Sequence, residues 1–423
     1  MNSVTGGSLA ELSRDTFALI LAGGNGTRLG ELTRWQCKPA IAFGGHFRNI
    51  DFTLSNCVNS GVRRIGVLTQ YKAHSLIAHI VGGWSFLPRA LGEFVEVWPA
   101  QQRVHSGWYA GTADAVFQNL DLVLAQGRRY TLVLAGDHIY KMDYAKLIQQ
   151  HAESGAGITI ACVPVPVEQA SSFGVLGADT QNRVNSFIEK PAPSTLAAAS
   201  TSPSATVLAS MGIYVFSTDY LVQLLKRDAA LPDSAHDFGR DILPFAVREN
   251  RVVAHAFVDE EGQPGYWRDV GTLDSYWQAH MELLSASPPM DLYDPRWPIR
   301  TLAEILPPAK LTEDAGRRGF VANSMLAAGT VVGSATVTRS VLSTNVRVSD
   351  GSMLDEAVVL PGARIGANCR LRRAIVDAGV EVPDGTVIGW QPTSSLERMN
   401  TAPHVTLVTG GDATGAKDFR SVA

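Results

Sequence analysis

The chain has 423 residues, which is too long for one compact hydrophobic core, so two domains are expected. Its formal net charge is −4 and 45% of its residues are hydrophobic, a composition typical of a globular protein. No concentrated basic surface is indicated, which argues against nucleic-acid and membrane partners. The scattered cysteines form no CxxC pair, so the sequence predicts neither a zinc site nor a disulfide framework, and it favours a cytoplasmic protein with reduced thiols.

The first predicted strand, Phe17–Leu21, runs directly into a glycine-rich turn that contains Gly23, Gly24 and Gly26. Glycines allow a sharp turn and bring bare N–H groups against an anion. Arg28 in the same turn, and Lys38 after it, supply the cations that a polyphosphate requires. Neither the dinucleotide fingerprint nor the P-loop pattern fits this order of residues. For the glycines alone, an ordinary tight connection after a strand remains an equal alternative.

Short apolar runs then alternate with helix-length segments, the pattern of an α/β domain with a mainly parallel sheet. Further strands are predicted at Arg64–Leu68, Tyr130–Leu134, Gly157–Val163 and Met211–Val215, and helices at Thr112–Ala125 and Tyr144–Ser154. Ala192–Val207 is predicted to be a surface loop. Asp291–Pro308 is rich in proline and lacks a period, which indicates an extended linker.

Two aspartates are candidate metal ligands. Asp137 follows the strand Tyr130–Leu134, and ligands of open α/β sheets bind beyond such carboxyl ends. Its alternative role is the N-cap of the following helix. Asp269 lies beside Arg268, so its alternative role is a local ion pair. Together with a triphosphate, the two carboxylates would suit a Mg²⁺ ion.

Three polar segments are weaker signals. Glu189 and Lys190 end a predicted strand and could bind a sugar hydroxyl and a single phosphate, although an isolated Glu-Lys pair is more often an exposed strand end. Thr112 begins a helix after Trp108 and Tyr109, where it could be only an N-cap. The loop His236–Asp241 is uninformative by itself.

After about Arg318 the aromatic residues nearly vanish and aliphatic residues recur at short intervals. A six-residue spacing joins Val341, Met353, Val359, Ile365 and Leu371, with Arg347 as the one defect, and a second such series runs through Val376, Val382 and Ile388. Aliphatic-glycine pairs accompany this spacing. The pattern predicts a parallel β-helix of hexapeptide repeats, with a small antiparallel sandwich as the alternative.

Many ordered motifs, taken together, resemble one family, the bacterial ADP-glucose pyrophosphorylases (glucose-1-phosphate adenylyltransferases). The resemblance is carried by Leu21–Gly24, Gly26–Leu29, Lys38–Ala40, Asp51–Phe52, Leu54–Asn56, Thr69–Tyr71, Gly83–Phe86, Gly111–Ala115, Ala135–Tyr140, Phe173–Val175, Glu189–Pro191, Ala209–Tyr214, Tyr266–Thr272, Trp297–Arg300 and Pro307–Lys310. It implies a Rossmann-like nucleotidyltransferase domain over residues 14–290 with a mostly parallel mixed sheet. A linker over 291–317 and a left-handed parallel β-helix over 318–410 would follow.

The resemblance also implies a reaction and a set of site residues. ATP and α-D-glucose 1-phosphate would give ADP-glucose and diphosphate, the committed step of bacterial glycogen synthesis, with Mg²⁺ held by Asp137 and Asp269. Arg28, Lys38 and Asp137 would be catalytic. ATP would contact Gly23, Gly24, Gly26, Thr27, Arg28, Gln101, Gly111 and Thr112. Glucose 1-phosphate would contact Tyr109, Gly174, Glu189, Lys190, Ser210 and Tyr214.

The family is usually homotetrameric and is regulated by phosphorylated metabolites, and here the sequence departs from the pattern. Asn25 stands where arginine is usual, and His46 where effector-binding members commonly have lysine, near Arg48. Lys72 replaces a common glutamine in the loop that relays effector binding, while Trp108 in the partner loop is retained. We therefore predict allosteric regulation with altered effector selectivity.

Three other functions are weighed against this one. Another nucleoside triphosphate could be the substrate, because a glycine turn binds phosphates without choosing the base. A catalytically weak regulatory subunit is a second alternative, which the presence of Arg28, Lys38, Asp137 and Lys190 argues against. An acyltransferase is the third, but the coils carry no obvious catalytic histidine.

Overall fold

The computed structural model of the protein describes residues 8–24, 26–101, 107–195, 206–259, 261–313, 316, 318–390 and 405–410. Asn25 lies outside these residues, as does the greater part of the Ala192–Val207 segment. The chain groups into two compact units. Unit 1 contains Met1–Asn25, Ile50–Trp267 and Pro295–Arg300, and unit 2 contains Gly26–Asn49, Arg268–Asp294 and Thr301–Ala423.

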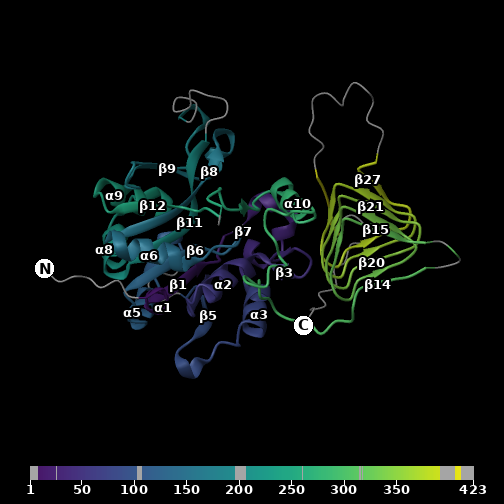
Figure 1. The fold of residues 1–423 in the computed structure, drawn as a ribbon, viewed down its shortest axis with the longest axis horizontal. Coiled ribbons are helices and arrows are strands. Elements are labelled where there is room, and N and C mark those ends of the chain that lie inside the picture. Colours follow the sequence, from purple (N-terminus) through teal and green to yellow (C-terminus); the bar gives the residue numbers. More distant parts are fainter. Residues whose placement is uncertain are drawn as a thin grey trace. The chain divides into compact units, whose positions relative to one another are not determined.

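Unit 1 is built on a mixed, mainly parallel sheet (Figure 1). Its strands are β1 (Thr16–Leu21), β4 (Arg64–Thr69), β5 (Phe94–Pro99), β6 (Tyr130–Ala135), β8 (Ile158–Pro166), β9 (Gly174–Ala178), β10 (Val184–Glu189), β11 (Thr206–Ser217) and β12 (Val252–Ala256). The order runs β10-β9-β11-β6-β1-β4-β5, with β8 pairing with both β11 and β12. The strands β6, β1, β4 and β5 are parallel, whereas β11 is antiparallel to its neighbours.

Helices pack against this sheet, whose strands β1, β4, β6 and β8 are mostly buried. They are α1 (Leu9–Arg14), α2 (Asn49–Asn59), α3 (His74–Gly83), η3 (Arg89–Leu91), α4 (Thr112–Phe117), α5 (Leu120–Ala125), α6 (Tyr144–Ser154), η4 (Val167–Ser172), α8 (Thr218–Ala229), η5 (Phe238–Ile242) and α9 (Leu243–Arg248). The short strands β7 (His138–Tyr140) and β13 (Trp267–Asp269) form a separate two-stranded sheet. One core cluster joins β1 and β6 to the apolar faces of α4, α8 and α9.

The five predicted strands are present, and the predicted helix at 144–154 is confirmed as α6. The predicted helix at 112–125 is wrong in one respect, because it is two helices that break at Gln118 and Asn119. The amide of Asn119 donates to the carbonyl of Ala115 at 2.8 Å and to the hydroxyl of Tyr109 at 3.0 Å. This side chain therefore ties the end of α4 to the preceding loop, a tertiary contact that a periodic pattern does not contain.

The register of the parallel strands brings the glycine turn and the Asp137 loop to one edge of the sheet. Leu21 at the end of β1 is paired with Leu68 of β4 on one side and Ala135 of β6 on the other. Beyond the ladder, Ala22 N–H donates to the carbonyl of Leu68, and Gly136 N–H donates to that of Leu21. Carboxyl ends of parallel strands are the usual place for ligands in such sheets.

Unit 2 begins with the helical turns η1 (Thr27–Thr33) and η2 (Lys38–Ala40), followed by a hairpin of β2 (Ala42–Phe43) and β3 (Phe47–Arg48) and, later in the chain, helix α10 (Leu273–Glu282). The segment 291–309 contains no helix or strand. The remainder of unit 2 is a left-handed parallel β-helix with three parallel sheets (Figure 1). They are formed by β14 (Lys310–Leu311), β17 (Val331–Val332), β20 (Arg347–Val348), β23 (Arg364–Ile365) and β26 (Glu381–Val382); by β15 (Phe320–Ala322), β18 (Thr336–Thr338), β21 (Met353–Asp355), β24 (Arg370–Arg372) and β27 (Val387–Ile388); and by β16 (Met325–Leu326), β19 (Val341–Leu342), β22 (Val358–Val359), β25 (Ala374–Val376) and β28 (Thr406–Val408).

The coils correct one detail of the predicted repeat. From β18 to β27, register partners lie 17 residues apart, as in the series Leu342, Val359 and Val376, so a strict six-residue spacing slips by one residue in each of these coils. In the preceding coil the partners lie 16 residues apart, as Met325 and Val341 do. Met353, placed in the core by that spacing, is 36% exposed, and its neighbour Leu354 is buried instead. Arg347 is no defect for the same reason, because Val348 is the residue that faces the core.

A corner of the β-helix is bound to α10 by polar contacts within unit 2. The indole N–H of Trp277 donates to the carbonyl of Glu356 at 2.7 Å, and the guanidinium of Arg373 lies over the Trp277 ring. Arg339 donates to both carboxylate oxygens of Asp355 at 2.7 Å. These contacts make α10 part of the packing of the β-helix.

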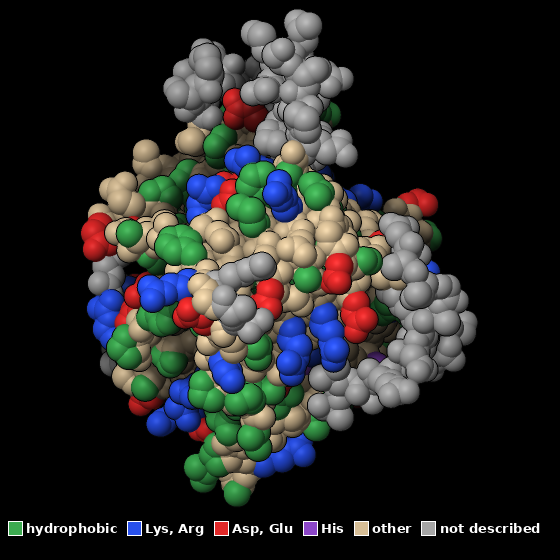
Figure 2. Space-filling model, turned by 90° about the vertical axis from the view of Figure 1, so that its right-hand side faces the viewer, with side chains coloured by type: hydrophobic (Ala, Val, Ile, Leu, Met, Phe, Trp, Pro, Cys, Tyr) green, Lys and Arg blue, Asp and Glu red, His purple; other side chains and the backbone are tan. Residues whose placement is uncertain are grey.

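Basic and acidic side chains are interspersed on the face drawn in Figure 2. They do not gather there into one basic patch, which is consistent with the small net charge of the chain. Among the described residues, no helix combines the length and the hydropathy that crossing a bilayer requires.

Candidate active site

The glycine turn after β1 packs against Gln70. A Cβ at Gly23 would lie 3.0 Å from Cγ of Gln70, which is closer than most side chains tolerate. The side-chain amide oxygen Oε1 of Gln70 in turn accepts the backbone N–H of Tyr109 at 3.0 Å. No heavy atom lies within 4 Å of a Cβ at Gly24. The protein thus packs closely against Gly23 and leaves open space beside Gly24, where a ligand could approach the backbone.

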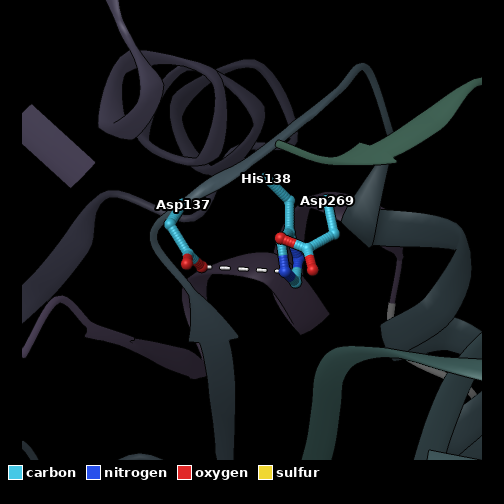
Figure 3. Close-up of side chains that lie close together, drawn as sticks. All are labelled: Asp137, His138 and Asp269. Carbon is cyan, nitrogen blue, oxygen red and sulfur yellow. Dashed lines mark ion pairs between the residues drawn. The ribbon is translucent and has the colours of Figure 1, made fainter. Parts of the chain in front are cut away.

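Asp137 lies at the end of β6, as predicted, and its position depends on Gly136. A Cβ at Gly136 would lie 2.8 Å from Ile50 and 2.9 Å from Ile20, so only glycine fits there. The Asp137 carboxylate faces Nε2 of His138 at 3.6 Å (Figure 3). Asp137 is not the N-cap of the next helix, because Asp143 caps α6 by accepting the N–H of Ala145. The Asp137 carboxylate is 28% exposed, so it can reach a ligand from solution.

Trp267 belongs to unit 1 and packs edge-on against the His138 ring with a centroid distance of 5.0 Å. It also packs against Phe173 at 5.1 Å. Nδ1 of His138 is buried without a hydrogen-bond partner among the described residues. The ring is therefore oriented by Trp267 and by Asp137.

Asp269, also drawn in Figure 3, is paired within unit 2 with the two basic residues of the N-terminal signature. Lys38 Nζ lies 2.5 Å from Oδ1 of Asp269, and Arg28 lies 3.5 Å from Oδ2. Lys38 is almost fully buried, whereas the Arg28 side chain is 56% exposed. Arg268 forms two hydrogen bonds with the Glu282 carboxylate, each 3.1 Å. The sequence did not predict that Lys38, Arg28 and Asp269 form one ion-pair cluster.

The predicted sugar-binding residues Glu189 and Gly174 meet at the paired ends of β9 and β10. A Cβ at Gly174 would lie 2.9 Å from Oε2 of Glu189, so the carboxylate lies directly against the Gly174 backbone. Lys190 follows with a left-handed φ of 45°, and its Nζ is 3.3 Å from the Glu189 carboxylate. The Lys190 side chain is 59% exposed and can swing to a phosphate.

Ser210 and Tyr214 are brought together by an irregularity in β11. The register against β8 shifts between these two residues, and Gly212 within the shift has a left-handed φ of 68°. The Ser210 hydroxyl therefore lies 3.2 Å from the Tyr214 hydroxyl. Burial raises the pKa of Tyr214, and the charges of Glu189 and Asp237 raise it further. Tyr214 thus stays protonated and acts as a hydrogen-bonding group.

Asp237 and Phe238, which the sequence alone did not single out, contact residues of the predicted site. Asp237 Oδ2 accepts the Thr112 hydroxyl at 2.9 Å, and Phe238 packs against Tyr214 with a centroid distance of 6.1 Å. Thr112 is not an N-cap, because Gly111 occupies that position of α4. The sequence does contain an acidic residue and a glycine in the loop His236–Gly239, which is a weak indication of a binding loop. Nothing in the sequence shows that this loop lies near Glu189 or Thr112.

The remaining predicted residues lie at the surface or at turns. Gly26 has a left-handed φ of 58° and precedes η1, whose first residue is Thr27. Gln101 and Trp108 are exposed. Lys72 has a φ of 46° and lies over the Tyr71 ring. His46 stacks on Phe47 at the tip of the β2–β3 hairpin, next to half-buried Arg48.

Comparisons with known proteins identify the families that the chain resembles. The nucleotidyl transferase family matches residues 17–286, and the GlmU-like C-terminal hexapeptide family matches residues 307–408. A glucose-1-phosphate adenylyltransferase of Paraburkholderia phytofirmans is 52% identical over 410 residues, covering 95% of this chain and 97% of its own. The chain belongs to the glucose-1-phosphate adenylyltransferase family.

Further relatives carry the same name. The Hydrogenovibrio crunogenus protein is 49% identical over 411 residues, covering 95% of both chains. The Thiobacillus denitrificans protein is 50% identical over 405 residues, covering 95% of this chain and 91% of its own. The similarity therefore spans both the nucleotidyltransferase sheet and the β-helix of this family member.

Proposed function

We propose that the protein transfers an adenylyl group from ATP to α-D-glucose 1-phosphate and so produces ADP-glucose and diphosphate for bacterial glycogen synthesis. The observation that carries this proposal is about 50% identity to glucose-1-phosphate adenylyltransferases over 95% of the chain. The residues of the proposed site are present in the sequence, and two of those in unit 1, Glu189 and Gly174, meet at the paired ends of β9 and β10.

In this proposal the phosphates of ATP contact the backbone of Gly23, Gly24, Gly26 and Thr27. Open space beside Gly24 supports a close backbone approach. Arg28 and Lys38 neutralise phosphate charge, and their present pairing with Asp269 keeps both cations positioned. Gln101, Gly111 and Thr112 are proposed to lie along the nucleotide.

Glucose 1-phosphate is proposed to bind the cluster around Tyr214. The Glu189 carboxylate and the Ser210 and Tyr214 hydroxyls offer acceptors and donors to sugar hydroxyls, and Lys190 offers a compact positive charge to the phosphate. Gly174 allows the sugar to approach, and Tyr109 closes the pocket. The hydrogen bond from Asn119 to the Tyr109 hydroxyl supports a fixed ring position.

Asp137 and Asp269 fit a Mg²⁺ ion by the chemistry of their donors. Mg²⁺ prefers oxygen ligands and usually binds one or two carboxylates together with substrate phosphates. Chain connectivity supports joint binding, because Trp267 packs on His138 beside Asp137, and Asp269 is two residues further along β13. Side chains two residues apart share one face of a strand and lie about 7 Å apart. His138 is proposed to orient Asp137, because Mg²⁺ does not favour imidazole.

The reaction requires alignment and charge stabilisation more than proton transfer. A phosphate oxygen of glucose 1-phosphate attacks the α-phosphorus of ATP in line, and diphosphate leaves on the opposite side. The nucleophile is already anionic, so no side-chain base is needed. Bound Mg²⁺ would supply stabilisation of the negative charge on the transferring phosphoryl group. Arg28 and Lys38 add positive charge, and Glu189 with Lys190 holds the sugar phosphate in place.

A diphosphate-release assay with glucose 1-phosphate and each of ATP, UTP, dTTP and GTP tests this proposal. We expect release with ATP to be fastest and to require both Mg²⁺ and the sugar phosphate. Faster release with another nucleotide would assign a different nucleotide sugar to the enzyme. Absence of release with all four would favour a regulatory subunit.

Assembly, regulation and location are also proposals that rest on the family resemblance. We propose a cytoplasmic homotetramer whose effector is a phosphorylated metabolite bound near His46 and Arg48, with Lys72 and Trp108 relaying the signal. The domain boundaries at 290/291 and 317/318 are proposed in the same way. Reaction velocity measured with a panel of phosphorylated metabolites tests regulation, and a flat response to all of them would overturn it.

A further inference from the structure

We propose that the loop Ser234–Gly239, called here the 234–239 loop, fixes the nucleotide side and the sugar side of the site relative to each other, with His236 as its positioning residue. This inference rests on the proposed function, because it takes Thr112 and Glu189 as members of the two sides. All residues that carry it lie in unit 1.

His236 adopts an unfavourable backbone conformation that its side chain stabilises. Its φ is 53°, a left-handed value that is unfavourable for most L-residues. Nδ1 of His236 lies 2.8 Å from Oδ2 of Asp228, which is buried. The Ser234 hydroxyl donates to Oδ1 of Asp228 at 2.7 Å and accepts the backbone N–H of His236 at 3.0 Å. Asp228 therefore anchors this turn from a position outside the loop.

The turn holds the start of α4 through the carbonyl of His236. That oxygen accepts the N–H groups of Ala113 at 2.8 Å and of Asp114 at 3.1 Å. A Cβ at Gly111 would lie only 2.3 Å from the same oxygen, so the two backbones are in direct contact. The first amides of α4 are consequently engaged by protein, and the helix start takes its position from His236.

The following residues reach the sugar side. Asp237 accepts the Thr112 hydroxyl, and that hydroxyl accepts the N–H of Phe238 at 3.0 Å. A Cβ at Gly239 would lie 2.3 Å from Oε2 of Glu189. Within four residues, the loop thus contacts the start of α4 on one side and the Glu189 carboxylate on the other.

The side chains of His236 and Asp228 line a pocket, so their hydrogen bond restrains the His236 ring where side-chain packing is incomplete. A cavity of about 140 Å³ lies beside the pair, lined by Phe117, Leu225 and Ala229 among others. Side chains around a cavity lose the contacts that would otherwise restrain them. Hydrogen bonding to Asp228 is therefore the main restraint on the His236 ring in that direction.

The test compares His236→Ala with His236→Asn in steady-state kinetics with each substrate varied separately. Asparagine tolerates the left-handed backbone, and its amide can donate to Asp228. We expect His236→Ala to raise the KM of glucose 1-phosphate and of ATP at least about fivefold each, because both sides lose their common support. His236→Asn should return both values to within about threefold of wild type. His255→Ala, which removes a histidine bonded to Gln150 away from the loop, is the matched control and should leave both KM values unchanged.

Thr112→Val is a second variant, in which helix α4 is kept and the hydrogen bond to Asp237 is lost. It tests the inference even if His236→Ala folds poorly. It should raise the KM of glucose 1-phosphate as well as that of ATP. Unchanged KM values in His236→Ala and Thr112→Val, with only a lowered melting temperature, would overturn the inference. Glu189→Gln distinguishes a failure of this inference from a failure of the proposed function. A normal KM for glucose 1-phosphate in that variant would overturn the proposed sugar site.

Discussion

The backbone of Gly239 lies directly against the carboxylate of Glu189. A Cβ at Gly239 would lie 2.3 Å from Oε2 and 2.7 Å from Cδ of Glu189. Gly174 approaches the same carboxylate from another strand. Two glycines, distant in sequence, thereby define where the proposed sugar-binding carboxylate lies.

Replacing Gly239 by alanine should displace Glu189 and weaken sugar-phosphate binding. We expect Gly239→Ala to raise the KM of glucose 1-phosphate at least about tenfold, because displacements near 1 Å can cost two orders of magnitude in rate. Gly107→Ala is the control, since a Cβ there meets no heavy atom of the described residues within 4 Å. Equal and small effects of the two substitutions in steady-state assays would show that the Glu189 position is unimportant for the sugar.

Asp137→Asn should slow turnover while leaving the fold intact. The substitution keeps the shape of the side chain and removes the charge that is proposed to hold Mg²⁺. We expect kcat to fall at least about 100-fold, the scale of a lost electrostatic contribution to a transition state. Saturating kinetics at several Mg²⁺ concentrations measure this, and a near-normal kcat would remove Asp137 from the catalytic set.

Lys190→Ala should act selectively on one substrate. Lys190 is exposed, and its ion-pair partner among the described residues is Glu189, so its loss should leave the packing of unit 1 unchanged. We expect a larger rise in the KM of glucose 1-phosphate than in that of ATP. Lys226→Ala, on the solvent side of α8, serves as the charge-matched control. Parallel effects on both substrates would contradict the assignment of Lys190 to the sugar phosphate.

His280 should make the stability of unit 2 depend on pH. Burial lowers the pKa of this histidine from 6.5 to about 4, and its Nε2 accepts the N–H of Gly44 while Nδ1 donates to the carbonyl of Tyr276. Below pH 6.5 the unfolded chain binds a proton that the native protein does not, so stability falls as the pH drops towards 4.

The magnitude follows from the same linkage. Between pH 7.5 and pH 5 the loss from His280 is about 2 kcal/mol. His151 and His255 are lowered in the same way, so His280 must be isolated by substitution. We expect the stability difference between wild type and His280→Gln, measured by urea unfolding, to shrink at pH 5. A difference that is independent of pH would show that the pKa of His280 is the same in the native protein as in the unfolded chain.

The sequence analysis succeeded where local pattern decides the structure. Phe17–Leu21 and Tyr130–Leu134 are short apolar runs beside glycines, so they became buried parallel strands with Asp137 at the end of one. The β-helix was recognisable from aliphatic spacing. The 17-residue spacing of its coils could not be recognised, because the stacking of the coils sets the shift of one residue. As a result Leu354 is buried in the core, and Met353 is not.

Other features depend on contacts between distant segments. The break in the predicted helix at Asn119 comes from its hydrogen bond to Tyr109, and the cluster of Lys38 with Asp269 joins residues 231 positions apart. The relation of Asp237 to the proposed site became visible through its hydrogen bond with Thr112 in the structure. A single sequence shows that these residues are present but does not show which of them contact each other. The sequence motifs could therefore suggest phosphate and metal binding without predicting how the side chains are arranged.

The central claim is that Asp137 and Asp269 hold one divalent ion during adenylyl transfer. Anomalous diffraction from crystals grown with Mn²⁺, glucose 1-phosphate and an unreactive ATP analogue tests it most directly. The account predicts one anomalous peak coordinated by oxygens of both aspartates and of the nucleotide. A peak bound to only one of these carboxylates, or to neither, would contradict it.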